Sequence, residues 1–241
     1  MWSDYPIKSG LGGSAAVVAS IIKCFDMAMG LELNRFQISE LAYQAERLSF
    51  GIPGGWQDQF STVMGGFNLM EFKSNSTTVH PINIPKDSIK TLEHSLILCD
   101  TGIKHDSGKI HDDQKEQLNN EIVFKNIKKN VQLVYKLREK LISGEINQLG
   151  LIMDQSWNFK KNIGKEITSK KLDNIYNFAK KNGAIGGKLL GAGGGGFFLF
   201  CTNVKDRSFL NYSLRKRGLN IHPFTFESNG LVGWADLEKG F

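Results

Sequence analysis

The segment KSGLGGSA, residues 8–15, places three glycines and two serines directly before a run of small and apolar residues that predicts a helix. Glycines let the backbone turn its N–H groups toward a ligand, and the positive end of a helix dipole attracts anions. A serine hydroxyl at the helix start is also a hard oxygen that Mg²⁺ accepts. The residues therefore predict a phosphate-binding loop, with a tight bend before a helix as the simpler alternative. The GxxxxGK(S/T) pattern and the strand-borne GxGxxG pattern are both missing, which excludes the two common phosphate-loop families.

Two acidic residues, Glu46 and Asp58, are candidates for phosphoryl-transfer chemistry. That chemistry needs oxygen ligands for Mg²⁺ and a carboxylate that orients the acceptor hydroxyl and takes its proton. Glu46 lies at the edge of an apolar helical stripe, where it can be partly shielded, and Asp58 lies between Gln57 and Gln59 in a glycine-rich segment. A surface glutamate and a turn-capping aspartate are the alternatives, and both stay open.

A third candidate is the glycine run GAGGGG, residues 191–196, between two apolar segments that predict strands. A simple hairpin turn needs one or two glycines, whereas this run permits very close approach to the backbone. We therefore expect another group to lie against this loop.

The composition of the 241-residue chain is that of an ordinary globular protein, with 41% hydrophobic residues and a net charge of +6. The positive residues are spread over predicted helix faces, which disfavours nucleic acid as a partner and leaves a mild attraction for phosphorylated small molecules. No membrane-spanning run or signal peptide is evident, so we expect a cytoplasmic protein without a membrane partner. Cys24, Cys99 and Cys201 lie in apolar segments and predict reduced core thiols.

The periodicity predicts an α+β fold. Glycine at position 30 ends the first helix, and Asn34 with Gln37 forms the capping signal of the second. A packed loop or short helix is expected over 51–66. The other predicted helices span 113–141, 146–159, 172–181 and 208–218, and the predicted strands are 67–72, 77–84 and 95–102 in one antiparallel sheet, a strand–turn–strand over 183–202, and short final strands at 222–226 and 231–234.

Apolar positions at helical spacing are the core candidates of these helices. In the first helix they are Ala15, Val18, Ala19, Ile22, Phe25 and Met29, in the second Ile38, Leu41, Ala42, Ala45 and Leu48, and in the long helix Leu118, Ile122, Val131, Val134, Leu137 and Leu141.

Three motifs in order, PIKSGLGGSAA, GGWQDQFSTVMGGFNLMEF and GGKLLGAGGGGFFLF, together with the Glu46 helix, resemble the GHMP superfamily of small-molecule kinases. Within it, the QDQ motif, LILCDTGIKHDSGKIHDDQ, SWNFKK and GAIGGKLLGAGGGG look most like the D-glycero-D-manno-heptose 7-phosphate kinases. The resemblance runs from Pro6 to the final strands. It implies an incomplete ribosomal S5 domain 2-like N-terminal part, residues 1–90, and a ferredoxin-like C-terminal domain, residues 91–241.

The resemblance also implies ATP and Mg²⁺ as cofactors and transfer of the γ-phosphoryl group to the anomeric hydroxyl of the heptose 7-phosphate. Ser14 and Glu46 would then hold Mg²⁺, and Asp58 would be the catalytic carboxylate. The residues implied around the ATP phosphates are Lys8, Ser9, Gly10, Leu11, Gly12, Gly13, Ser14 and Ala15, and those implied around the sugar are Gln57, Asp58, Thr101, Gly102, Gly191, Ala192, Gly193 and Gly194.

The sequence departs from the family pattern at three places. The usual paired serines of the phosphate loop are Gly13 and Ser14, and Lys104 with His105 stands where relatives often have arginine. Relatives also carry roughly a hundred residues before this loop, a typical domain length. We therefore expect an exposed apolar stripe on the first helix, and a separate N-terminal chain, self-association or loss of activity.

The alternatives of function are a related sugar kinase, such as an L-fucose kinase, and a non-catalytic remnant that binds nucleotide or a partner chain. Dependence on a phosphate at the far end of the sugar separates the first alternative from the heptose kinase. A basic nucleic-acid-binding module ranks last, because interleaved exposed aromatic residues are missing.

Overall fold

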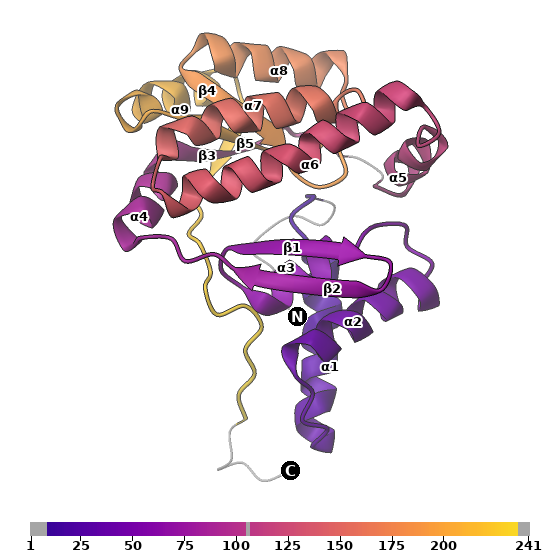
Figure 1. The fold of residues 1–241 in the computed structure, drawn as a ribbon. Coiled ribbons are helices and arrows are strands. Elements are labelled where there is room, and N and C mark those ends of the chain that lie inside the picture. Colours follow the sequence, from indigo (N-terminus) through magenta and orange to yellow (C-terminus); the bar gives the residue numbers. More distant parts are fainter. Residues whose placement is uncertain (1–8, 105–106, 236–241) are drawn as a thin grey trace. The chain divides into compact units, whose positions relative to one another are not determined.

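The protein is described by a computed structural model over residues 9–104 and 107–235. Its contacts form two compact units, shown in Figure 1. Unit 1 contains Ile82–Phe226 and the described residues up to Leu11, and unit 2 contains Gly12–Pro81 and the described residues from Glu227 on. The domain division at residues 90 and 91 stays a prediction.

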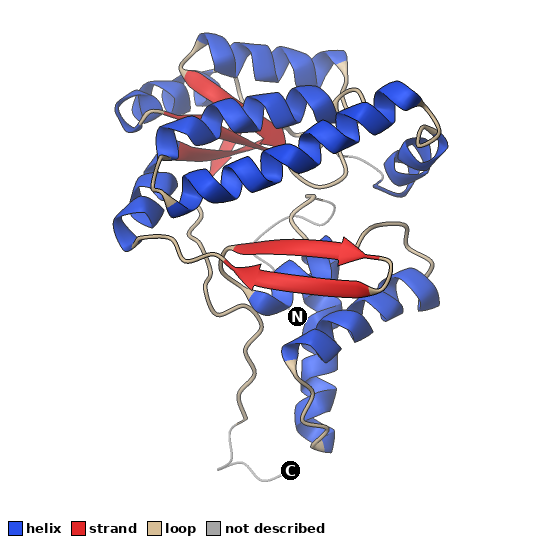
Figure 2. Ribbon diagram, in the orientation of Figure 1, coloured by secondary structure: helices blue, strands red, loops and turns tan. Residues whose placement is uncertain are grey.

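Unit 1 is built on a four-stranded antiparallel sheet with the order β4-β5-β3-β6 (Figures 1 and 2). Helices connect β3 to β4 and β5 to β6, while a glycine loop connects β4 directly to β5. This connectivity is the ferredoxin-like βαββαβ arrangement that the family resemblance implied. The strands are β3 (Leu96–Asp100), β4 (Ala184–Leu189), β5 (Phe197–Thr202) and β6 (Asn220–His222).

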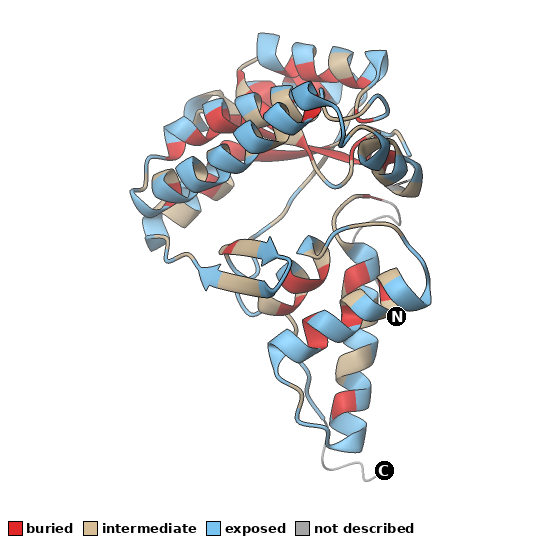
Figure 3. Ribbon diagram, turned by 45° about the vertical axis from the view of Figure 1, so that its right-hand side comes forward, coloured by how far each residue is buried: buried red, intermediate tan, exposed pale blue. Residues whose placement is uncertain are grey.

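The helices of unit 1 pack an aromatic core against this sheet. Trp157 and Tyr176 lie with ring centroids 5.6 and 5.7 Å from Phe198 of β5, and buried positions follow the strands and the inner sides of the helices (Figure 3). The helices are α4 (Lys86–Ser95), α5 (Ser107–Glu116), α6 (Glu121–Ile142), α7 (Leu149–Lys160), α8 (Lys170–Lys181) and α9 (Arg207–Lys216), with short 3₁₀ turns at Ile146–Gln148 and Val204–Asp206.

Unit 2 combines helices with a two-stranded hairpin. The elements are α1 (Gly13–Met29), α2 (Arg35–Gln44), the π-helical turn η1 (Ala45–Ser49), α3 (Gln57–Met64), β1 (Asn68–Lys73) and β2 (Ser76–Pro81). Gly30 ends α1 in the left-handed conformation at φ 64°, and Asn34 and Gln37 form the reciprocal capping box of α2. Both predicted helix boundaries are therefore confirmed. Ala19, Ile38, Ala42 and Val63 form the core.

Three predicted elements are wrong. β1 and β2 pair with each other, whereas β3 pairs with β5 and β6, so the three early strands do not share one sheet. The long helix is two helices, because residues 117–120 interrupt it. The predicted strands 222–226 and 231–234 are not formed; only Asn220–His222 pairs with β3. Hydrophobic periodicity identifies extended segments but not their partners.

Several predicted core residues are exposed. Val123 and Leu141 form the buried side of α6, whereas the predicted core residues Ile122, Val131 and Val134 of this helix are exposed. Phe25 and Met29 at the end of α1 are 60% and 66% exposed, so the stripe of this helix is exposed over its last turns as expected. The remaining exposed candidates are Leu41, Leu48 and Leu118.

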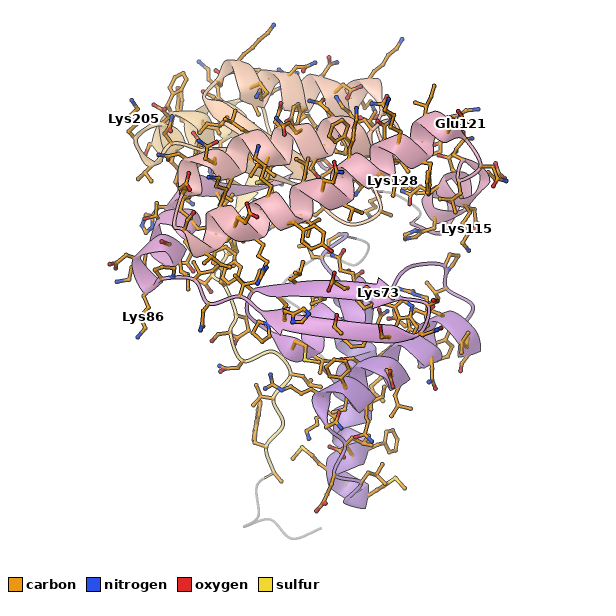
Figure 4. All side chains as sticks on the ribbon, in the orientation of Figure 1. Lys73, Lys86, Lys115, Glu121, Lys128 and Lys205 are labelled. Carbon is orange, nitrogen blue, oxygen red and sulfur yellow. The ribbon has the colours of Figure 1, made fainter. Side chains whose placement is uncertain are left out.

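Several lysines on the helical segments of unit 1 are exposed. Lys86, Lys128 and Lys205 are exposed and project outward in Figure 4. Lys128 also covers the ring of Phe124, with its nitrogen 4.5 Å from the ring centroid. These charged side chains therefore lie on helix faces that are exposed to solvent. Within the described ranges, no helix is long and apolar enough to cross a membrane.

Candidate active site

The phosphate-loop prediction falls on a sharp entry into α1. Gly12 is left-handed, with φ 73°, and α1 begins at the next residue with no side-chain cap and no acidic residue in its first turn. A side chain at Gly13 would meet no atom within 4 Å. The first-turn N–H groups of a helix lack intrahelical acceptors and carry the positive end of its dipole. This start of α1 therefore has the properties of an anion site. Lys8 lies outside the described residues.

Ser14, Glu46 and Gln59 form one hydrogen-bonded cluster in unit 2. The Ser14 hydroxyl donates to Glu46 Oε1 at 2.5 Å, and Gln59 Nε2 donates to Glu46 Oε2 at 2.5 Å. Glu46 is 1% exposed and Gln59 is 0% exposed, whereas Ser14 is exposed. Three helical elements thus bring one hydroxyl and one buried carboxylate together.

Glu46 continues the buried side of α2, four residues after the buried Ala42, and lies at the start of the π-helical turn. The Phe50 N–H donates to the Ala45 carbonyl oxygen at 3.0 Å, which is a hydrogen bond across five residues. This wider turn changes the helical register after α2, and Glu46 is its first-turn acidic residue. Regular helical spacing predicts Glu46 at the edge of the apolar stripe of this helix, and its complete burial was not predicted.

Asp58 lies in the first turn of α3, next to the glycine loop. A methyl group on Gly12 would lie 3.9 Å from the Asp58 carboxyl carbon. Stacking of Tyr43 on Trp56, with ring centroids 3.5 Å apart, holds the residue that begins α3. Gly12, Ser14, Glu46 and Asp58 are therefore brought together within unit 2.

The two glutamines of the QDQ motif have different environments. Gln57, an expected sugar-side residue, is exposed, whereas Gln59 joins the buried cluster. No role for Gln59 was predicted from the sequence. Its position directly after the candidate catalytic aspartate is the signal that could have identified it.

In unit 1, Thr101 joins the segment after β3 to the glycine run at residues 191–196. The Thr101 N–H and hydroxyl both donate to the Gly196 carbonyl oxygen, at 3.0 and 2.7 Å, and the Gly196 N–H donates to the Ile103 carbonyl oxygen at 2.8 Å. Thr101 is buried by this pairing, whereas Gly102 is exposed. Lys104 is exposed, and His105 lies outside the described residues.

The start of the glycine run at residues 191–196 lies against Gly10 of the segment KSGLGGSA. A side chain at Gly191 would lie 2.8 Å from the Gly10 Cα, and one at Gly10 would lie 3.1 Å from the Leu190 carbonyl oxygen. Ser9, next to this contact, is buried. Two of the three glycine motifs are therefore brought together within unit 1.

Side chains and backbone fix the rest of this loop. Lys160 Nζ donates to the Gly191 carbonyl oxygen at 2.5 Å, and Gln114 Nε2 donates to that of Ala192 at 3.3 Å. A side chain at Gly193 would lie 3.0 Å from the Ile167 Cα, and the Gly194 N–H donates to the Ile167 carbonyl oxygen. Part of the glycine run is thus explained by packing within the unit.

Gly195→Ala tests this packing. A Cβ at position 195 would lie 2.3 Å from the Ile103 carbonyl oxygen, and we expect the strain to lower the free energy of unfolding by about 1–3 kcal/mol. Urea unfolding measures the change. Gly55→Ala is the control, because a Cβ there would meet nothing within 4 Å. Equal stabilities of the two variants would contradict the steric argument.

Lys188 on β4 is a partly buried charge that the sequence analysis did not identify. Leu199 is its cross-strand neighbour, and burial lowers the pKa of the ammonium group. In the part of the chain that the structure describes, no ion pair or hydrogen bond to Lys188 offsets this burial. The unfolded chain therefore holds the proton on Lys188 more tightly than the folded chain does.

Lys188→Met should stabilise the protein at neutral pH. We expect the free energy of unfolding to rise by at least about 1 kcal/mol, since a buried polar group without a hydrogen bond costs that much. The wild-type stability should rise with pH between the lowered pKa of Lys188 and the unfolded value of 10.5, because the unfolded chain binds more protons in this window. Urea unfolding at neutral and alkaline pH measures both effects. The exposed Lys171→Met is the control, and the same pH dependence in both variants would contradict the assignment.

The cysteines show no metal or disulfide chemistry within the described residues. Burial raises the pKa of the Cys99 thiol to about 12 and that of Cys201 to about 11. Both are reduced core thiols as predicted, whereas Cys24 is exposed and the prediction is wrong for it. No described group of three His, Cys, Asp or Glu residues is arranged to hold a metal ion.

The ferredoxin-like unit, the glycine loop before α1 and the Ser14–Glu46 pair are the features expected from the resemblance to small-molecule kinases. The family description "GHMP kinases N terminal domain" matches residues 1–66, and "GHMP kinases C terminal" matches residues 137–208. D-glycero-alpha-D-manno-heptose 7-phosphate kinase of Campylobacter jejuni is 36% identical over 234 residues, which are 97% of this chain and 69% of that protein. The chain belongs to the GHMP kinase family, which confirms the resemblance and the kinase class.

Two further relatives extend the comparison. The crystal structure of a D-glycero-D-manno-heptose 1-phosphate kinase from Bacteriodes thetaiotaomicron is 27% identical, with a TM-score of 0.77 over 98% of this chain and 66% of that one. The bifunctional fucokinase/GDP-fucose pyrophosphorylase of Arabidopsis thaliana is 29% identical over 216 residues, covering 86% of this chain and 20% of that protein. The chain thus spans about two thirds of the two heptose kinases.

Proposed function

We propose that the protein is an ATP-dependent kinase that phosphorylates the anomeric hydroxyl of D-glycero-D-manno-heptose 7-phosphate. The observation that carries the proposal is the buried Glu46 carboxylate, bonded to Ser14 beside the uncapped start of α1. Membership of the GHMP kinase family and the heptose kinase relatives support the substrate class. Its cytoplasmic location and its assembly with another chain stay predictions.

The residues present fit Mg²⁺. Glu46 is buried and accepts hydrogen bonds only from uncharged groups, Ser14 and Gln59, among the contacts of the described residues. A carboxylate, a hydroxyl and nucleotide phosphates are the hard oxygen ligands that this cation prefers. Ser14 and Glu46 would hold it, and it would supply neutralisation of the charge on the β- and γ-phosphates.

The chain's own groups supply binding and proton transfer. The N–H groups at the start of α1 hold phosphate oxygens, since the helix dipole and the open Gly13 favour an anion there. Asp58 orients the sugar hydroxyl and accepts its proton as the hydroxyl oxygen bonds to the γ-phosphorus. The bond from that phosphorus to the ADP oxygen breaks in the same transfer.

Turnover of defined sugars tests the proposal. The purified chain is incubated with Mg²⁺-ATP and the heptose 7-phosphate, and ³¹P NMR follows ADP and a heptose bisphosphate. We expect both products, and no product when the 7-phosphate is removed from the sugar. Saturable nucleotide binding without transfer to any sugar would favour the non-catalytic alternative.

L-fucose is the second candidate substrate, because the matched Arabidopsis protein includes a fucokinase. Phosphorylation of L-fucose with no use of the heptose 7-phosphate would select this candidate. The two substrates are compared under identical conditions with the same preparation.

A further inference from the structure

Gln59 has an unusual combination of contacts. Its side chain is completely buried, and its Nε2 donates to Glu46 Oε2 at 2.5 Å. Its Oε1 is enclosed and has no hydrogen-bond partner in the described part of the chain. An enclosed carbonyl without a partner costs about 1–3 kcal/mol. An apolar side chain of similar size would avoid this cost but would leave Glu46 Oε2 without its donor, so the contact with Glu46 is the reason for a glutamine at this position.

The amide nitrogen acts on Glu46 from the side opposite to Ser14. Each carboxylate oxygen has one donor, Ser14 of α1 for Oε1 and Gln59 of α3 for Oε2. Two donors on different helices fix the rotation of the carboxylate plane. The described residues show no ion pair to Glu46. Its orientation therefore depends on these two uncharged partners.

We propose that Gln59 is a positioning residue that orients the Glu46 carboxylate for a divalent cation. This inference rests on the proposed function and adds a residue that acts through Glu46. The amide nitrogen holds Oε2 and leaves Oε1, beside the exposed Ser14 hydroxyl, as the oxygen to be offered to the cation. Loss of a partner that orients a metal ligand typically lowers metal affinity or activity by about 10–100-fold.

Mn²⁺ binding tests the inference independently of turnover. Electron paramagnetic resonance measures free Mn²⁺ with the full chain and a non-hydrolysable ATP analogue. We expect Gln59→Leu to weaken Mn²⁺ affinity by about 10–100-fold with little change in the urea midpoint of unfolding, because removal of the unpaired oxygen offsets the loss of the donor to Glu46 Oε2. Gln59→Met is a second apolar variant, with a more flexible side chain of similar length, and the same loss of Mn²⁺ affinity is expected for it. Gln44→Leu, at an exposed position of α2, is the control and should retain wild-type affinity.

A folded Gln59 variant with wild-type Mn²⁺ affinity would overturn the inference and leave the proposed function intact. A wild-type chain that binds no Mn²⁺ with the nucleotide would overturn both. If the Gln59 variants do not fold, NMR of the ¹⁵N-labelled wild type tests the inference instead. The Gln59 side-chain amide signals should shift when Mg²⁺ and the analogue are added, and unchanged signals in a chain that binds them would overturn the positioning role.

Discussion

Asp58→Asn is expected to lower kcat by about 10²–10⁴-fold, the usual contribution of a positioned acid–base group. Asparagine keeps the size of the side chain but cannot accept the proton of the sugar hydroxyl. Affinity for Mg²⁺-ATP should change little, because the role proposed for Asp58 is on the acceptor hydroxyl. Stopped assays give kcat, and calorimetric titration with the nucleotide gives the affinity.

The control for Asp58→Asn is Asp87→Asn. Both aspartates lie in the first turn of a helix, Asp58 in α3 and Asp87 in α4. Each loses an interaction with a helix dipole that is worth about 0.3–1 kcal/mol, and Asp87→Asn measures the effect of that loss on stability and turnover. Only Asp58→Asn should lose turnover. Parallel losses of nucleotide affinity and kcat in Asp58→Asn would contradict a role on the acceptor side.

Glu46→Gln is expected to weaken Mn²⁺ and Mg²⁺ binding by at least about 100-fold, the upper end of the effect of losing an outer-shell partner. The variant removes the negative charge of the proposed cation ligand and retains the shape of the side chain. The kcat/KM for Mg²⁺-ATP should fall by a similar factor. Electron paramagnetic resonance with Mn²⁺ and initial rates at several Mg²⁺ concentrations measure the two effects.

The stability of Glu46→Gln should remain close to that of the wild type. Rotation of the Gln59 amide by half a turn would present its unpaired Oε1 to the new amide nitrogen. The cluster then keeps two hydrogen bonds, with Gln59 Nε2 in the enclosed position that Oε1 occupies in the wild type. Glu40→Gln is the control, because Glu40 is an exposed residue of α2. Glu46→Gln with unchanged metal affinity would remove Glu46 from the metal site.

The amino-acid sequence determined the local features of the site and of the fold. The glycines and serines at residues 9–14 and the capping signal at Asn34 are local, since the atoms that they position lie within a few residues. The strand–turn–strand around residues 191–196 and the ends of α1 and α8 were predicted for the same reason. Ser14, Glu46 and Asp58 were selected by chemistry and motif, and all three lie in unit 2.

The tertiary structure decided which distant segments meet. Period-two patterns are the same whichever strand lies alongside, so the sequence could not separate the β1–β2 hairpin from the sheet that contains β3. Regular helical spacing predicts Glu46 only at the edge of the apolar stripe, and its complete burial follows from the packing of α1 and α3, which bring Ser14 and Gln59 to its carboxylate. The choice of Gln59 over Gln57 required the packing of α3, because burial and hydrogen bonding distinguish two residues of the same type. Contacts between distant residues depend on packing, and only the folded chain supplies them.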